Sequence, residues 1–315
     1  MGFNVGGLSV WADEISSGLA KEVLLNADTL SQNLTTKKYG CIGDSTKLNR
    51  VGTTAYAVLA ACGTIANTGS TTLSQTIMTH CGIEFPQFLC NEILKSYWTD
   101  WEAQKSFNTE SLGRYEDVML ANILETDRIA LDKMIWQADN SAVPYKTGLT
   151  GNLTLCRGFL GTAYAYSATT AANLAKTAMT IVNAGVVIQS VLASVPEVIA
   201  DKAVAYLSPL DFQKVVAWAV NEYKYNASLI DINAITEFRF PTSLGLVIKK
   251  VNGMSGVDSG TMIVTTTENI VLGISDESDL GLFSWYEKKD RGLWVNLKVK
   301  IGTGYYFPEI TVLVK

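Results

Sequence analysis

The chain has 315 residues, which is enough for one large domain or two lobes with a sizeable core. Its formal net charge is −5, which excludes the strongly basic surface that proteins use to neutralise nucleic-acid phosphates. Charged residues make up 17% of the sequence, compared with about 25% in an average soluble domain. Such a low charge content has three ordinary causes: membrane insertion, a very large core, or extensive burial against other subunits.

Membrane insertion is the least favoured of these causes. The best candidate for a membrane span is 177–196, but it carries Asn183, Gly185, Gln189 and Ser190 in its middle, whereas a spanning helix needs about 20 mainly apolar residues. The first residues, MGFNVGGLSVWADE, contain neither the basic region nor the continuous apolar stretch of a secretion signal. We therefore expect a protein that neither enters a membrane nor is secreted.

The cysteines indicate a reducing environment. Their number is odd, and no pair has the C-x-x-C spacing: they are Cys41, Cys62, Cys81, Cys90 and Cys156. Without a secretion signal, we expect them to be reduced thiols, most of them small buried apolar residues.

The N-terminal third divides into an arm and an uncharged stretch. Residues 1–40 carry scattered apolar residues and end on the polar run SQNLTTKK, which predicts an arm that is ordered only when it docks on something. From Val51 to Thr79 no residue is charged, although the stretch is rich in Thr, Ser, Gly and Ala. Two structures fit it equally well. One is a buried helix at 54–62 followed by a polar loop; the other is an extended two-stranded excursion covered by a neighbouring subunit, with its turn on Gly69.

Residues 109–138 give the strongest helical pattern, with apolar residues at helical spacing and charged residues on the other faces. The apolar set is Leu112, Tyr115, Met119, Ile123, Ile129, Ala130, Met134 and Ile135. The charged set is Arg114, Glu116, Asp117, Glu125, Asp127, Arg128, Asp132 and Lys133. A helix of this length spans roughly 45 Å, which is typical of a spine laid across a sheet.

The next part of the chain mixes helices and a strand. Residues 170–194 predict a second helical region, and KAVAYLS (202–208) predicts a buried strand. A helix follows, because Ser208 is a good N-cap and Pro209 suits the first helical position. In this helix Asp211 is placed to reach back like the acidic residue of a capping box.

Strands dominate from residue 240 onward. LGLVIKKVNG ends on Asn252-Gly253, a hairpin signal, and TMIVTTTENIVLGIS holds two short strands. LWVNLKVKI alternates cleanly, with Leu293, Val295, Leu297, Val299 and Ile301 on one face and Trp294, Asn296, Lys298 and Lys300 on the other. The following GTG predicts a turn, and YYFPEITVLV predicts the final strand. The overall pattern is α+β.

The segment THCGIEFPQFLC (79–90) concentrates the reactive residues of the chain. It contains the single histidine, His80, together with Cys81, Glu84 and Cys90. Their spacing does not match structural zinc sites, and neighbouring side chains of a strand point to opposite faces. No nucleotide-binding, nucleophile-elbow or zinc-protease motif occurs elsewhere. We therefore expect no catalytic, cofactor-binding or metal-binding residues. The segment instead predicts a strand, IEFP, ending at Pro86, followed by a helix, QFLCNEILKSYW.

The helical segment SLGRYEDVMLANILETDRIALDKMIWQADN (111–140) resembles the spine helix of the major capsid proteins of tailed bacteriophages, which share the Hong Kong 97-like fold. Residues 177–226 resemble the start of the axial domain of that family, and 240–275 resemble its later part. TIMTHCGIEFPQFLCNEILKSYW is similar to capsid proteins of phages that infect Bacteroides and relatives. The resemblance implies an N-terminal arm (1–40), an extended loop (41–90), a peripheral domain (91–165) with the spine helix (109–138), an axial domain (166–274), and strands that return to the peripheral domain (275–315).

The function that this resemblance implies is structural. Copies of the chain would assemble into the hexamers and pentamers of an icosahedral shell around double-stranded DNA, without enzymatic activity or a cofactor. The implied partners are other copies, a scaffold, a portal and decoration proteins, with packaged DNA nearby but not specifically bound and no membrane. The implied location is the virion capsid, assembled in the host bacterial cytoplasm.

Three alternatives stay open at this point. An encapsulin, a cellular cargo shell of the same fold, would show the same order of elements. An α+β hydrolase could use scattered carboxylates that the sequence alone does not bring together. A membrane-associated protein would use residues 177–196.

Overall fold

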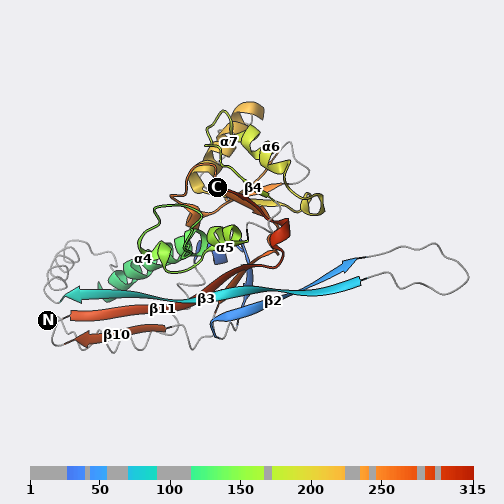
Figure 1. The fold of residues 1–315 in the computed structure, drawn as a ribbon. Helices are drawn as coiled ribbons and strands as arrows, with labels where there is room; N and C mark the ends of the chain where they lie inside the picture. Colours follow the sequence, from blue (N-terminus) through green and yellow to red (C-terminus); the bar gives the residue numbers. More distant parts are fainter. Residues whose placement is uncertain are drawn as a thin grey trace, which may run out of the picture.

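The computed structural model describes residues 27–39, 43–54, 70–90, 115–166, 172–223, 235–240, 246–274, 281–287 and 292–315. Within these ranges the chain forms two six-stranded sheets. A long helix, α4 (Tyr115–Gln137), lies along the first sheet, and the second sheet stands above α4 with its own helices (Figure 1). This arrangement of mixed sheets and helices confirms the predicted α+β class.

The first sheet has the strand order β1-β9-β11-β3-β2, and β10 pairs with β11 beside this path. Its members are β1 (Thr36–Lys38), β2 (Ser45–Thr54), β3 (Ser70–Cys90), β9 (Ile270–Ile274), β10 (Gly281–Glu287) and β11 (Gly292–Tyr305). The second sheet has the order β4-β12-β8-β5-β7-β6. Its members are β4 (Ala172–Leu174), β5 (Val204–Leu207), β6 (Glu237–Arg239), β7 (Val247–Lys250), β8 (Met262–Thr265) and β12 (Val312–Val314).

Shorter helices complete the described structure. The α-helices are α2 (Asp28–Ser31), α5 (Phe159–Ala165), α6 (Ala184–Leu192) and α7 (Pro209–Tyr223). The 3₁₀ turns are η1 (Gly151–Thr154), η2 (Glu197–Ile199), η4 (Asn252–Met254) and η6 (Pro308–Ile310). The main core lies around α4 and α5, which pack against the first sheet and one face of the second. A second core lies between α6, α7 and the second sheet.

The alternation predicted for the late strand is confirmed in β11. Val295, Leu297, Val299 and Ile301 are buried in the main core, and Lys298 on the opposite face is exposed. The predicted turn at GTG is wrong, because β11 continues through Gly302 and Gly304 to Tyr305. A Cβ atom on Gly302 would lie 2.5 Å from Cδ2 of His80. These glycines therefore serve close approach between β11 and its neighbours.

The uncharged stretch forms part of a two-stranded hairpin. Strands β2 and β3 pair antiparallel from Ser45↔Thr79 to Thr54↔Ser70, and Figure 1 shows the hairpin projecting beyond the second sheet. The two-stranded alternative is therefore confirmed for 45–54 and 70–79. Residues 55–69 lie outside the described part of the chain, as does the turn predicted on Gly69.

Strand β3 is longer than predicted. It does not end at Pro86 but pairs with β11 as far as Cys90, so the helix predicted from Gln87 is wrong at its start. Pairing with β2 stops at Thr79, and Pro86 is therefore tolerated, since a proline suits a strand edge where no N–H is required. Residues 91–98 of that predicted helix lie outside the described ranges.

The predicted spine helix is confirmed as α4 over Tyr115–Gln137, and residues 109–114 lie outside the described part. Leu131, Met134 and Ile135 are buried as expected. Ile129, assigned to the apolar face, is instead 46% exposed. Asp127 and Asp132, assigned to the solvent faces, are 2% and 4% exposed. Polar partners from other segments explain the buried acids and are described below.

The described end of the predicted arm docks on its own chain. Leu30 and Leu34 belong to the main core, and β1 pairs in parallel with β9. Over 27–38 the surface on which the predicted arm docks is therefore the core of its own chain. Residues 1–26 lie outside the described ranges.

The second sheet with α6 and α7 forms a unit around the second core, called the second unit below. The sequence predicted its elements in part. The buried strand predicted at 202–208 is confirmed as β5, and the N–H of Asp211 donates to Oγ of Ser208 at 3.3 Å, which confirms the predicted cap of α7. The carboxylate of Asp211 does not reach back; it accepts hydrogen bonds from the N–H of Gly260 and Oγ of Ser259, both at 2.7 Å.

Three further expectations for this unit are wrong, the first only in part. The helix predicted over 170–194 is confirmed as α6 over Ala184–Leu192, but Ala172–Leu174 form β4 and the segment between them is irregular. Just before α6 begins, the N–H of Thr180 donates to Oδ1 of Asn183 at 2.7 Å. Asn252-Gly253 is no hairpin turn: it forms η4, and β7 and β8 both pair with β5. The final segment is split into η6 and β12, and β12 joins the second sheet instead of the first.

Candidate functional site

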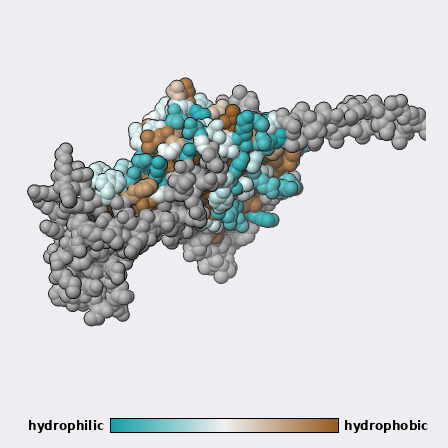
Figure 2. Space-filling view, turned by 90° about the horizontal axis from the view of Figure 1, so that it is seen from below, coloured by the Kyte–Doolittle hydropathy of each residue, from teal (hydrophilic) through white to brown (hydrophobic). Residues whose placement is uncertain are grey.

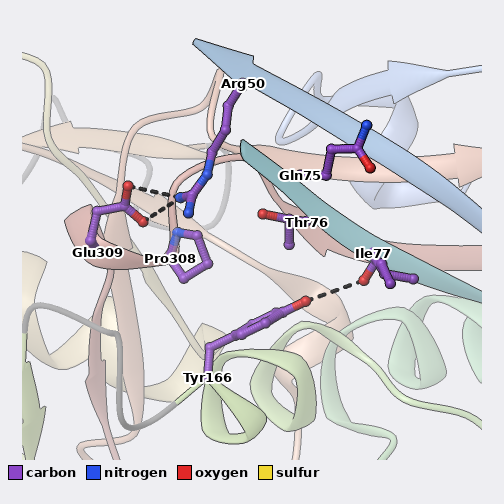
Figure 3. Close-up of a pocket in the computed structure, with 7 residues that line it drawn as sticks. All are labelled: Arg50, Gln75, Thr76, Ile77, Tyr166, Pro308 and Glu309. Carbon is purple, nitrogen blue, oxygen red and sulfur yellow. Dashed lines mark hydrogen bonds and ion pairs between the residues drawn. The ribbon is translucent and has the colours of Figure 1, made fainter. Parts of the chain in front are cut away.

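The root of the β2–β3 hairpin contains a hollow of about 630 Å³ between the first sheet, the end of α5 and η6 (Figure 3). It is lined by Arg50, Gln75, Thr76, Ile77, Tyr166, Pro308 and Glu309. These residues come from four separate regions of the sequence, so the hollow marks the point where the projecting hairpin is attached to the body.

Arg50 ties the hairpin to the turn before β12. Its Nε donates to Oγ of Ser74 at 2.5 Å, across the β2–β3 pair. Its terminal nitrogen lies 2.8 and 2.7 Å from the two carboxylate oxygens of Glu309 (Figure 3). Glu309 belongs to η6, which leads directly into the second sheet. This ion pair therefore links the hairpin to the segment that leads into the second sheet.

Two neutral hydrogen bonds support the same root. The hydroxyl of Tyr166, at the end of α5, donates to the carbonyl of Ile77 at 3.2 Å, and Oγ1 of Thr76 donates to the carbonyl of Tyr306 at 3.4 Å. Burial raises the pKa of Tyr166 above its ordinary value, so its hydroxyl stays a proton donor. The side chain of Ile77 is 58% exposed and is free to contact another molecule.

A disulfide joins Cys81 on β3 to Cys156 after η1, with Cα atoms 5.8 Å apart. The prediction of reduced thiols is therefore wrong for this pair. The cause is long-range: the bond spans a sequence separation of 75, which spacing rules do not capture. Cys90 forms no disulfide, and Cys41 and Cys62 lie outside the described ranges.

The remaining reactive residues of 79–90 do not converge on one point. His80 is 8% exposed; its Nδ1 lies 3.1 Å from the carbonyl oxygen of Gly43, and its Nε2 has no hydrogen-bond partner. Glu84 accepts a hydrogen bond from Nδ2 of Asn296 at 3.2 Å. In the described residues no group of three or more His, Cys, Asp or Glu side chains is placed to hold a metal ion. The geometry of 79–90 therefore suits a structural role.

A buried polar network joins the arm, the spine and the second unit. The N–H and Oγ1 of Thr29 donate to Oδ1 of Asp132 at 3.0 and 2.5 Å, and Nε1 of Trp136 donates to Oγ1 of Thr29 at 2.7 Å. Asp28 pairs with Arg128 at 3.0 Å and accepts from Nδ2 of Asn252 at 2.7 Å. Burial raises the pKa of Asp132, while the hydrogen bonds from Thr29 oppose this shift.

Sequence reasoning missed this network and the hairpin root. Asp127 and Asp132 were grouped with the other charged residues of α4. Helical periodicity alone did not distinguish these two buried acids from the charged residues that are exposed. Thr29 lies 103 residues from Asp132, and Arg50 lies 259 residues from Glu309. One signal was available: Asp127 and Asp132 are flanked by the apolar residues of the face that the pattern assigned to the core.

The window 177–196 does not form a membrane-spanning helix. The part of the chain that the structure describes holds no helix long and apolar enough to cross a membrane. The helix within that window, α6, covers Ala184–Leu192 and packs into the second core.

No family model matches the sequence, and no curated protein matches it. Solved structures match over most of the chain. A chain from Gordonia phage Cozz is 11% identical, with a TM-score of 0.58 over 91% of this chain and 86% of that one. A chain from a procapsid of satellite phage P4 that includes the size determination (Sid) protein is 9% identical, with a TM-score of 0.57 over 95% and 98%. A chain from the capsid of an empty GTA particle is 10% identical, with a TM-score of 0.50 over 92% and 89%.

These likenesses run through both sheets and the helix between them, and they identify the fold. The chain has the Hong Kong 97-like fold of phage capsid proteins, as the spine helix and the order of elements predicted.

Proposed function

Because the chain has the Hong Kong 97-like fold, we propose that it is the major capsid protein of a tailed bacteriophage. Copies of it would assemble into the hexamers and pentamers of an icosahedral shell that encloses double-stranded DNA. The observation that carries the proposal is the likeness to a procapsid chain over 95% of this chain and 98% of that one.

We also propose the domain boundaries that the sequence suggested. Residues 1–40 are the N-terminal arm, 41–90 the extended loop, 91–165 the peripheral domain with the spine, 166–274 the axial domain and 275–315 strands that return to the peripheral domain, apart from β12 in the second sheet. The projecting β2–β3 hairpin supports the assignment of the extended loop. Its two strands pair with each other beyond the body, and their outer edges need a neighbour to cover them.

Exposed apolar side chains support contact with other copies. On the first sheet Phe88, Phe283 and Trp285 are 40%, 53% and 43% exposed. Trp294 lies between Phe88 and Trp285, with ring centroids 4.9 and 5.9 Å away. From below, hydrophobic residues stand among hydrophilic ones over the described surface (Figure 2). Aromatic side chains are enriched where proteins associate.

The proposed partners follow from the proposed function. They are other copies of the chain, a scaffold, a portal and decoration proteins, with assembly in the host bacterial cytoplasm and a final place in the virion capsid. The net charge of −5 supports a shell that faces packaged DNA without binding it specifically.

Electron microscopy of the protein expressed alone and with candidate scaffold proteins tests the proposal. We expect closed shells, tubes or sheets of hexamers, and DNA-filled particles when the chain comes from infected cells. A monomer under all of these conditions, at high concentration, would contradict the proposed function. Shells of uniform small size that hold protein cargo and no DNA would contradict the phage assignment alone.

A surface substitution tests the role of the hairpin. Ile77→Asp places a charge on a side chain that is 58% exposed, so folding is little affected while a covered interface would receive an unpaired charge. We expect normal thermal unfolding but no shells. Ile77→Val is the matched control and should assemble with normal yield. Shells of normal yield from Ile77→Asp would exclude this part of the hairpin from subunit contacts.

A further inference from the structure

The disulfide fixes the hairpin root to the end of the spine helix. Cys81 lies on β3 just beyond the last residue that pairs with β2. Its partner, Cys156, follows η1, and η1 is attached to the end of α4 because the N–H of Asp139 donates to the carbonyl of Leu153 at 2.8 Å. One covalent bond therefore connects the projecting hairpin to the element that organises the main core.

Besides the β3–β11 pairing and the buried contacts of Leu48 and Met78, two side-chain connections at the root are partly exposed to solvent. In the ion pair at the root, the side chains of Arg50 and Glu309 are 23% and 50% exposed. The hydrogen bond from Tyr166 to the carbonyl of Ile77 is also exposed to solvent. Water and salt weaken such contacts, whereas they do not weaken a covalent bond. The disulfide therefore adds a covalent restraint to the noncovalent contacts of the root, and its redox state changes how firmly the root is held.

The two cysteines differ in their access to solvent. Cys156 is 3% exposed and belongs to the main core, while Cys81 is half-buried at the edge of that core. An oxidant from solution therefore reaches Cys81 first, and Cys156 is placed to attack the product. Cys90 is half-buried on the same strand and forms no disulfide, which makes it a matched control.

We propose that Cys81 and Cys156 form an oxidation-dependent clamp that locks the hairpin root after the protein leaves a reducing compartment. The proposal rests on the proposed function, in which subunits assemble in the cytoplasm and the finished particle is released into the medium. Cytoplasmic thiols are kept reduced, so reversible contacts alone hold the root while the hairpin settles against its neighbour. Oxidation after release then fixes the settled position.

A small disulfide such as oxidised glutathione supplies the oxidant. The thiolate of Cys81 attacks one of its sulfur atoms, which forms a mixed disulfide and releases one glutathione thiolate. The thiolate of Cys156, its proton lost to solvent, then attacks Sγ of Cys81 and displaces the second glutathione thiolate. The two protein thiols lose two electrons and two protons in total, and the oxidant is reduced to two thiols.

The test compares the full-length protein before and after oxidation by glutathione disulfide, as wild type, Cys81→Ser and Cys90→Ser. Mass spectrometry of non-reduced peptides should find the Cys81–Cys156 link in oxidised wild type and Cys90→Ser. Hydrogen exchange at the amides of 74–80 should slow at least about tenfold on oxidation of these two proteins and stay unchanged in Cys81→Ser. The reduced and oxidised wild type carry the comparison even if Cys81→Ser does not fold.

Failure to form this link, or a link that leaves exchange at 74–80 unchanged, would overturn the clamp. Electron microscopy of the same samples separates this failure from that of the proposed function. Shells with exchange that is insensitive to oxidation would contradict the clamp alone. Slowed exchange in a protein that never forms shells would support the clamp and contradict the proposed function.

Discussion

Asp127 should make the stability of this protein depend on pH. It lies on α4, is 2% exposed, and its Oδ2 has no hydrogen-bond partner. Desolvation raises the pKa of the carboxyl group from 3.8 to about 6, while a hydrogen bond from Gln87 on β3 opposes the shift. At neutral pH the folded protein therefore holds a poorly solvated carboxylate between the spine and the first sheet.

The sign follows from the direction of the shift. Because the pKa is higher in the folded state than in the unfolded state, the folded state binds the proton more tightly and loses stability as pH rises. The loss develops between about pH 4 and pH 6, the two pKa values, and is complete above them. An increase of about two pKa units corresponds to about 3 kcal/mol of unfolding free energy.

The substitution Asp127→Asn removes the ionisation and keeps the shape. We expect the variant to be more stable than wild type at pH 7, by up to about 3 kcal/mol, which is roughly 4 °C in melting temperature for a chain of this length. At pH 4 the two proteins should melt within about 1 °C of each other. Thermal unfolding of the full chain, followed by tryptophan fluorescence across this pH range, measures both differences.

Glu125→Gln is the matched control, two residues earlier on the same helix. Its hydrogen bond with Arg128 lowers the pKa of Glu125, so this carboxylate adds stability above its unfolded pKa and loses it as pH falls. The control should therefore be slightly less stable than wild type at pH 7. An Asp127→Asn variant that gains no stability between pH 4 and pH 7 would refute the burial argument.

Two further predictions concern the junction of arm, spine and second unit. A Cβ atom on Gly253 would lie 2.4 Å from the backbone oxygen of Asp132. Gly253→Ala should therefore lower the unfolding free energy by about 1–3 kcal/mol, as overpacking does. Unchanged thermal unfolding would contradict the contact. Thr29→Val removes a hydroxyl that bonds both Asp132 and Trp136. It should lower the unfolding free energy by about 2–4 kcal/mol, because two buried polar atoms lose a partner. Hydrogen exchange at the amides of 28–34 should become faster than in wild type, and equal exchange would rule out the network as the anchor of this segment.

Alternation, capping and helical periodicity correctly predicted the elements that depend only on residues close together in the sequence. The alternation of β11 needs one buried face, and Val295 to Ile301 supply it. The cap at Ser208 needs one side chain and one N–H three residues on. The long helix α4 has enough apolar repeats for its period to be recognised, although two buried acids stand within it.

Residues with two possible uses were predicted less well. Gly302, Gly304 and Gly253 were assigned to turns, but each serves close approach by a neighbouring segment, which only the folded chain supplies. Pro86 was assigned to a strand end because proline lacks an N–H; it stands within β3 at a position where the pairing with β2 has already stopped. In each case the residue type permits both structures, and contacts with distant segments determine which of them forms.

The long-range contacts share one anchor, and the two proposed assembly elements meet there. The arm is held by Arg128 and Asp132 in the second half of α4. The hairpin is held by the disulfide to the segment that bonds the end of α4 at Asp139. Between them Trp136 is fully buried, with ring centroids 5.0 Å from Phe159 and 5.3 Å from Tyr206.

This shared anchor distinguishes two kinds of substitution. A change at Trp136 disturbs the packing beneath the arm and the hairpin together, so it should affect every contact that either element makes. A change at Arg50 removes the ion pair with Glu309 and weakens the attachment of the hairpin alone. Under the proposed function, the spine helix therefore supports assembly indirectly, because its buried second half keeps the arm and the hairpin in fixed relation.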